Sequence, residues 1–368
     1  MSGFFIYGPL LDDNLREQVV GAPLAGQPAV LTNHALRLEA NGDAILIAQA
    51  GATVSGLMLY PNAKQAARLA YYATGCGGSP ETCDVRIGTE QREATLFRIS
   101  GTTGVGPWDF GEWSTRYGKV TRRAADEAMA YLGEIDGTTL RARMPTILMR
   151  AAARLRGETH DAPVTLRSAT HRDRVEVIAE TRPYVDYFAV EEVIVSHPRF
   201  DGGKSERLKR AGFVMGDAVT VLPYDPVRET VMLIEQFRAA PFLRGDPRPW
   251  VLEPIAGRID PGETPEEAAR REAIEEAGLE LRALHLIGGN YPSPGAVTEY
   301  LFCHIGIADL PDEAEGLGGL DAEGEDIRAH VIPFDRLMEL VETGEIDTGP
   351  TMLSALWLER ERARGRFA

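Results

Sequence analysis

The pattern of hydrophobic and polar positions divides the chain into two parts that differ in the length of their apolar runs. The first part opens on a short apolar strand, FFIY at 4–7, and an alanine-rich stretch at 119–132 is typical of a helix. From about residue 171 the apolar runs lengthen, and 218–237 is expected to form two strands joined by a turn around Asp225. Further elements are expected as helices at 146–156 and 350–363 and as strands at 44–48, 54–59, 94–99, 184–195, 284–287, 300–305 and 329–333.

This change in the hydrophobic pattern suggests two domains and an α+β fold. A chain of 368 residues is long enough for two domains, each with its own core. The stretch 157–170 (GETHDAPVTLRSAT) is polar and weakly periodic, so we place a linker there, although it could be a surface loop within one domain. The predicted domains are therefore 1–156 and 171–368.

One helix in the second part has both of its ends specified locally. Thr264 is a good N-cap, Pro265 suits the first helical position, and Glu267 completes a capping box. Gly278 stands where a glycine commonly ends a helix. We therefore predict a helix over 265–277.

This helix carries three glutamates, Glu272, Glu275 and Glu276, at positions that share one face. Like charges at this spacing destabilise a helix by roughly 0.2–0.5 kcal/mol per pair, so a purely structural helix would avoid them. Carboxylates one turn apart can bind a hard divalent cation such as Mg²⁺, and Arg271 could orient one of them. The opposite face is expected to meet the core through Ala268, Ala269, Ala273, Ile274 and Ala277.

Composition and charge narrow the classes of function. Hydrophobic residues make up 44% of the chain and charged residues 26%, which is ordinary for a globular protein. The formal net charge of −16 argues against binding to nucleic acids or anionic membranes, which requires basic surface. An acidic protein that acts on an anionic substrate would need local positive charge, most simply a divalent cation.

The cysteines and the apolar runs point to a cytoplasmic protein. The three cysteines form no CxxC pair and leave an odd count, which favours reduced thiols. The opening MSGFFIYGPLLDD has no basic region and turns polar too early for a signal peptide. No apolar run approaches the roughly 20 residues that span a bilayer.

The predicted helix and the loop before it resemble the complete Nudix box. The matching positions are Gly257, Glu263, Arg271, Glu272, Ala273, Glu275, Glu276, Gly278 and Leu279. The resemblance implies an α/β/α sandwich that depends on Mg²⁺, for which Mn²⁺ could substitute. It also implies hydrolysis of a nucleoside diphosphate linked to another moiety.

The flanking segments resemble the ADP-ribose pyrophosphatase group of this family over about 180–360. These segments are EQFR (235–238), LEPIAG (252–257), SPGAVTE (293–299), DAEGEDIRAHVIP (321–333) and TGEIDTGPTMLSALWL (343–358). The metal ligands implied by the resemblance are the Ala256 carbonyl, Glu272, Glu276 and Glu325. The implied catalytic residues are Glu323 as general base, with Glu275 and Arg271 in support. The implied substrate contacts are Arg238, Ser293 and Glu299.

The segment 309–326 is acidic and rich in glycine, with eight acids and four glycines. Taken alone it reads as a solvated loop, but beside a carboxylate helix it is better explained as a mobile loop that closes over a bound diphosphate. Either Glu323 or Glu299 could act as the general base, and the sequence leaves that choice open.

The first domain resembles gamma-glutamyl cyclotransferase-like domains, which contain a β-barrel with helices. The resemblance rests on FFIYGPLLDDNL (4–15) and VSGLMLY (54–60). Pro9 stands where that family has Ser or Thr, and LAYYATG (69–75), where its catalytic glutamate is placed, contains no acid. We therefore expect this domain to have a binding or structural role, and altered chemistry is the alternative.

The sequence thus predicts a hydrolase that converts ADP-ribose to AMP and ribose 5-phosphate. Two alternatives stay open: another nucleoside diphosphate derivative as substrate, such as a sugar nucleotide or dinucleotide, or a nucleotide-sensing protein with weak turnover. The intact set of glutamates favours an enzyme. Resemblance to the ADP-ribose pyrophosphatases also implies a homodimer.

Overall fold

The computed structural model describes residues 3–39, 42–99, 106–311, 314, 316–319 and 326–367. The chain forms two compact units. The first unit comprises residues 1–171 and 184–189, and the second comprises 172–183 and 190–368. The predicted boundaries, with a linker at 157–170, stay a prediction. None of the helices within the described residues is long and apolar enough to cross a membrane.

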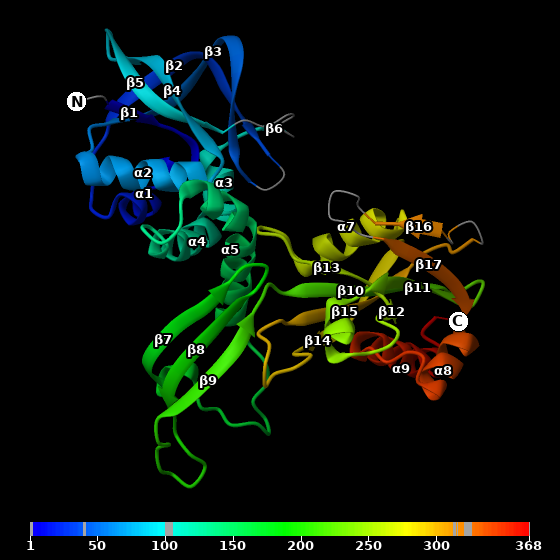
Figure 1. Cartoon of the computed structure of the whole chain (residues 1–368). Helices are drawn as coiled ribbons and strands as arrows, with labels where there is room; N and C mark the ends of the chain where they lie inside the picture. The colour runs from blue at the N-terminus through cyan, green and yellow to red at the C-terminus, as the bar shows by residue number, and fades with distance from the viewer. Residues whose placement is uncertain are drawn as a thin grey trace. The chain divides into compact units, whose positions relative to one another are not determined.

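The first unit is a β-barrel accompanied by helices (Figure 1). Its strands are β1 (Gly3–Ile6), β2 (Gln27–Leu38), β3 (Ala44–Leu59), β4 (Gly78–Ile87), β5 (Glu90–Ile99) and β6 (Gly106–Pro107). Its helices are the 3₁₀ turn η1 (Gly8–Leu11), α1 (Asp13–Val20), α2 (Ala63–Gly75), α3 (Phe110–Arg116), α4 (Gly118–Ala130) and α5 (Gly137–Glu158). The sheet order β3-β1-β5-β4-β2 is closed by pairing of β2 with β3, and β6 adds to β2.

Two apolar clusters stabilise this unit. Phe5, Leu46 and Leu96 are buried in a cluster formed by the barrel strands. Leu15 and Leu140 belong to a second cluster, which joins the helices to the barrel. The fold of this unit agrees with a barrel-and-helix class, while its relation to cyclotransferase-like domains stays a prediction.

The later part of the chain contains a large mixed sheet and a small three-stranded sheet. The strands are β7 (Glu176–Val185), β8 (Ala189–Ser196), β9 (Leu208–Val214), β10 (Ala218–Asp225), β11 (Thr230–Phe237), β12 (Trp250–Glu253), β13 (Ile255–Arg258), β14 (Ala283–Asn290), β15 (Leu301–Ile307), β16 (Gly316–Gly318) and β17 (Ile327–Pro333). The helices are the 3₁₀ turn η2 (Arg172–Arg174), α6 (Ala239–Arg244), α7 (Pro265–Ala277), α8 (Phe334–Thr343) and α9 (Gly349–Ala363).

The large sheet is the middle layer of an α/β/α sandwich. Its order is β14-β15-β10-β11-β17-β16, with β12 paired to β11 and β13 paired to β10. Ile234 and Val219 pack with Ala269 of α7 on one face of the sheet. Leu233 packs with residues of α8 and α9, among them Leu358, on the other face. The sandwich therefore follows from strands that are apolar on both faces.

Two expectations about individual elements were wrong. The stretch 184–195 is not one strand, because the chain turns between β7 and β8, where the Asp186 N–H donates to the Phe188 carbonyl at 3.0 Å. The strands expected at 44–48 and 54–59 are one strand, β3, which stays paired with β2 on both sides of a register shift. Helix α8 was not expected.

Candidate active site

The carboxylate-bearing helix α7 begins and ends at the predicted residues. The Thr264 hydroxyl accepts from the Glu267 N–H at 3.2 Å, and the Glu267 carboxylate accepts from the Thr264 N–H at 2.8 Å. Gly278 adopts the left-handed conformation with φ 62°, and its N–H donates to the Ile274 carbonyl at 2.9 Å. The helix is therefore specified by local contacts that do not depend on the crowded carboxylates.

The packing of α7 differs from the prediction in two respects. Ala268, Ala269 and Ala273 are fully buried as expected, but Ile274 is 56% exposed. Glu272 and Glu276 do not lie on a solvated face, since they are only 9% and 3% exposed. The helix has turned these two carboxylates toward the sheet.

The close approach of β13 explains how the two carboxylates are accommodated. A Cβ atom placed on Gly257 would lie 1.9 Å from the Glu272 carboxyl carbon, so any other residue at this position would displace that carboxylate. One residue earlier, the Ala256 N–H donates to Glu276 Oε2 at 3.1 Å. The helix and this strand end therefore bring Ala256, Glu272 and Glu276 together.

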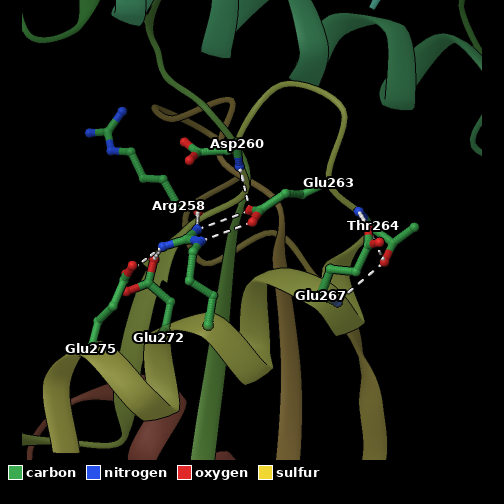
Figure 2. A network of polar contacts seen from close by, with 8 residues as sticks. Arg258, Asp260, Glu263, Thr264, Glu267, Glu272 and Glu275 are labelled. Carbon is green, nitrogen blue, oxygen red and sulfur yellow. Dashed lines mark hydrogen bonds and ion pairs between the residues drawn. The ribbon is translucent and has the colours of Figure 1, made fainter. Parts of the chain in front are cut away.

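Arg271 connects the carboxylates around it into one network. Its members Glu263, Glu272 and Glu275 are labelled in Figure 2. Arg271 Nη1 donates to Glu272 Oε1 at 2.7 Å and to Glu275 Oε2 at 2.8 Å. Its Nε and Nη2 donate to Glu263 at 2.9 and 3.0 Å. Burial alone would lower the pKa of Arg271, but its bonds to Glu263 and Glu275 and the charge of Glu272 more than offset this and raise it. Arg271 is thus held charged and orients three glutamates.

The loop before α7 is closed by the same network. The Glu263 carboxylate accepts from the Asp260 N–H at 3.1 Å, and the Glu263 N–H donates to the Asp260 carbonyl at 3.0 Å. Burial raises the pKa of the Asp260 carboxyl, although the charge of Arg271 opposes the shift. This loop therefore has a fixed shape that depends on Glu263.

Arg238 lies just beyond β11, and its Nε donates to Glu253 Oε2 at 2.7 Å. Burial raises the pKa of the Glu253 carboxyl, and Arg238 partly offsets the effect. The predicted substrate contact is therefore anchored by a carboxylate on the neighbouring strand β12.

Glu299 and Ser293 come from the segment between β14 and β15. The pKa of the Glu299 carboxyl is raised by burial, an effect that Arg258 and Arg238 oppose and Asp217 reinforces. Glu299 therefore lies in the electrostatic field of the arginines at the ends of β11 and β13. Ser293 is exposed, and its carbonyl accepts from the N–H groups of two residues that follow it in the same turn. The bonds described for Ser293 link it to its own turn and not to the other predicted site residues.

Two predicted site residues, Glu323 and Glu325, lie outside the described residues. Within the part of the chain that the structure does describe, no group of three or more His, Cys, Asp or Glu side chains is arranged to hold a metal ion. Among the described residues near α7, the groups that could bind a cation are the two buried carboxylates, Glu272 and Glu276, and the main-chain carbonyl of Ala256. Oxygen donors of this kind suit a hard cation such as Mg²⁺.

Sequence reasoning missed three charged residues at this end of the sheet: Asp217, Glu253 and Arg258. Arg258 directly follows Gly257 of the Nudix-box motif, and Glu253 lies in the LEPIAG segment that ends at this glycine. Their positions in the sequence could therefore have marked both as candidate site residues. Asp217 precedes β10 and is only 4% exposed. Its position could not be inferred, because it depends on the pairing of β10 with β13.

A capped helix on a mixed sheet, with buried carboxylates oriented by an arginine, defines a site suited to metal-assisted hydrolysis of an anionic substrate. The NUDIX domain model matches residues 215–352. The ADP-ribose pyrophosphatase of Escherichia coli (strain K12) is 38% identical over 188 residues, which cover 51% of this chain and 89% of that protein. The chain belongs to the Nudix hydrolase family and is an enzyme that hydrolyses diphosphate bonds.

Other similar proteins differ in the substrate that they are named for. The ADP-ribose pyrophosphatase of Haemophilus influenzae (strain ATCC 51907 / DSM 11121 / KW20 / Rd) is 34% identical over 192 residues, 52% of this chain and 88% of that protein. The GDP-mannose pyrophosphatase of Escherichia coli O9:H4 (strain HS) is 36% identical over 174 residues, 47% of this chain and 89% of that protein. A solved structure titled "Crystal structure of ADP compounds hydrolase" covers 52% of this chain and 96% of its own, with 23% identity and a TM-score of 0.41.

Proposed function

We propose that this enzyme hydrolyses the diphosphate of ADP-ribose to AMP and ribose 5-phosphate. The observation that carries the proposal is the carboxylate network of α7, in a chain 38% identical to an ADP-ribose pyrophosphatase over 188 residues. Water must attack one phosphorus of an anionic diphosphate, which requires positive charge and a proton acceptor close to the bond.

The residues that would hold a divalent cation are Glu272, Glu276 and the Ala256 carbonyl, with Glu325 as a further ligand. A bound Mg²⁺, or Mn²⁺ in its place, would neutralise the charge on the diphosphate oxygens. Arg271 and Glu263 keep Glu272 in place, because the guanidinium bridges both carboxylates. Glu275 belongs to the same network, which supports a positioning role for it.

The proton acceptor is proposed to be Glu323, which the acidic segment 309–326 would carry to the substrate. Glu299 is the alternative base, since its raised pKa places a carboxyl closer to neutral pH. Arg238, Ser293 and Glu299 are proposed to contact the substrate. The bond from Arg238 to Glu253 supports this role, because it fixes the guanidinium at the end of β11.

A second candidate substrate class is supported by the likeness to a GDP-mannose pyrophosphatase, at 36% identity. The decisive experiment is a panel of ADP-ribose, GDP-mannose and a dinucleotide, each assayed with Mg²⁺ and with EDTA. We expect AMP and ribose 5-phosphate from ADP-ribose only when Mg²⁺ is present. Preferred release of GMP and mannose 1-phosphate would favour the sugar nucleotide. Binding without turnover of any substrate would favour the nucleotide sensor.

We also propose that the first unit is a cyclotransferase-like binding module without that family's catalysis. Helix α2, where the family's glutamate is expected, carries no acid from Ala63 to Gly75. The full chain, given a gamma-glutamyl amino acid, should release no 5-oxoproline. If 5-oxoproline were released, and were still released by a variant with the α7 glutamates substituted, this assignment would be contradicted.

We further propose a cytoplasmic homodimer. Apolar side chains of the second unit between the start of β7 and the end of β9 are solvent-exposed in the single chain, among them Val177, Phe200 and Phe213, which are 53%, 101% and 44% exposed. Such surface is usually covered by a partner. Light scattering coupled to size exclusion should give the mass of two chains, and a monomer at micromolar concentration would contradict the proposal.

A further inference from the structure

Arg258 is the last residue of β13, one position after the glycine that admits Glu272. Side chains alternate along a strand, so Arg258 shares a face of β13 with Ala256, while Ile255 faces the buried alanines of α7. The Arg258 carbonyl accepts from Arg271 Nη2 at 2.9 Å, which fixes the end of the strand. The Arg258 side chain extends away from the pairs around Arg271 (Figure 2). The fold therefore holds the main chain of Arg258 rigidly beside the proposed metal ligands.

The surroundings of Arg258 contain a second arginine and a carboxylate. Burial raises the pKa of the Glu299 carboxyl, while the positive charges of Arg258 and Arg238 oppose the shift and Asp217 reinforces it. Strand pairing places these residues near one another: Arg258 pairs with Ala218 of β10, and Ala218 pairs with Leu301 of β15, two residues after Glu299. Arg238 directly follows β11, which also pairs with β10. Two guanidiniums therefore converge on the region where the substrate contact Glu299 is placed.

This convergence matters because the site is otherwise strongly acidic. Helix α7 and its loop present Glu263, Glu272, Glu275 and Glu276, and Arg271 is already bonded to three of these carboxylates. A diphosphate that approached these groups would be repelled unless further cations faced it. Guanidinium suits this purpose, because its planar fork donates two parallel bonds to phosphate oxygens.

We propose that Arg258 binds phosphate oxygens of the substrate beside Arg238, and so sets the affinity of the enzyme for nucleoside diphosphates. This assignment rests on the proposed hydrolysis of a nucleoside diphosphate derivative. Arg258 would act in binding and not in bond cleavage. Its removal should therefore raise KM and leave kcat largely unchanged.

The test compares Arg258→Met with Arg270→Met in the full-length chain. Both variants lose one positive charge, but Arg270 lies on another side of α7, where it bonds to Glu266 and to the Leu281 carbonyl. Calorimetry in EDTA measures binding of ADP-ribose and of inorganic pyrophosphate without turnover. Arg258→Met should weaken both by about 10- to 100-fold, as expected for a charged hydrogen bond, and Arg270→Met should weaken them by less than about twofold.

Arg258→Lys provides the second variant, since it keeps the positive charge but loses the planar guanidinium that can donate two parallel bonds. We expect it to weaken binding less than Arg258→Met does, and wild-type affinity in both variants would overturn the assignment. A lower Tm with unchanged dissociation constants would show a structural role and would also overturn it. If the wild type neither binds nor hydrolyses ADP-ribose, but pyrophosphate binding falls in Arg258→Met, the proposed substrate is wrong and the phosphate contact stands.

Discussion

Replacing Gly257 by alanine should inactivate the enzyme through Glu272. The added Cβ would lie 1.9 Å from the Glu272 carboxyl carbon, whereas ordinary contact begins at 3.4 Å. The carboxylate must therefore move by about 1.5 Å, since Gly257 lies in a paired strand and can yield little. Gly257 does not have the positive φ that disfavours alanine, so the substitution acts by steric contact and not by backbone strain.

The magnitude follows from how strongly catalysis depends on position. A displacement of about 1 Å can lower a rate about 10²-fold, which corresponds to roughly 2.7 kcal/mol in the activation free energy. We expect Gly257→Ala to lower the Mg²⁺-dependent kcat/KM for ADP-ribose by at least this factor. Gly349→Ala is the matched control, because a Cβ there meets no atom within 4 Å, and it should keep wild-type activity.

A double-mutant cycle with Glu272→Asp can refute the reasoning. Aspartate is one methylene shorter, so the methyl group added by Gly257→Ala would have less to displace, and the two substitutions should be strongly non-additive. Kinetics of the wild type, the two single variants and the double variant give the coupling free energy. Additive effects would show that Gly257→Ala acts through something other than contact with Glu272.

Three further predictions concern the same helix and its surroundings. Glu276→Gln should lower Mg²⁺-dependent turnover by about 10²-fold or more while circular dichroism stays unchanged, and full turnover would exclude Glu276 as a ligand. Glu299→Gln should raise Tm at pH 8, because the raised pKa means that folding disfavours the Glu299 carboxylate. This difference should shrink as pH falls from the raised pKa of Glu299 to the ordinary carboxyl pKa and should vanish below that value, so a Tm difference that grows on acidification would contradict the assignment. Thr264→Ala should lower the free energy of unfolding by about 1 kcal/mol in urea denaturation, since it removes the cap of α7, and an unchanged midpoint would contradict that role.

Local contacts made α7 predictable to the residue. The capping box of Thr264 and Glu267 and the left-handed Gly278 lie within one turn of the helix ends that they specify. Strand boundaries were less predictable, because they depend on partners far along the chain. β3 continues through Gly51, where the sequence pattern breaks, since β2 supplies pairing on both sides of the break.

The site itself was predictable in its residue types but not in its environment. An amphipathic pattern assigns charged residues to solvent, which is why Glu272 and Glu276 were expected on an exposed face and Ile274 in the core. Their actual burial requires the strand end at Ala256 and Gly257, which is set by pairing of β13 with β10. Burial changes the chemistry, because repulsion between desolvated carboxylates is stronger than between solvated ones. The network therefore needs Arg271 and, in our proposal, a divalent cation, and a helix with the same sequence in solvent would need neither.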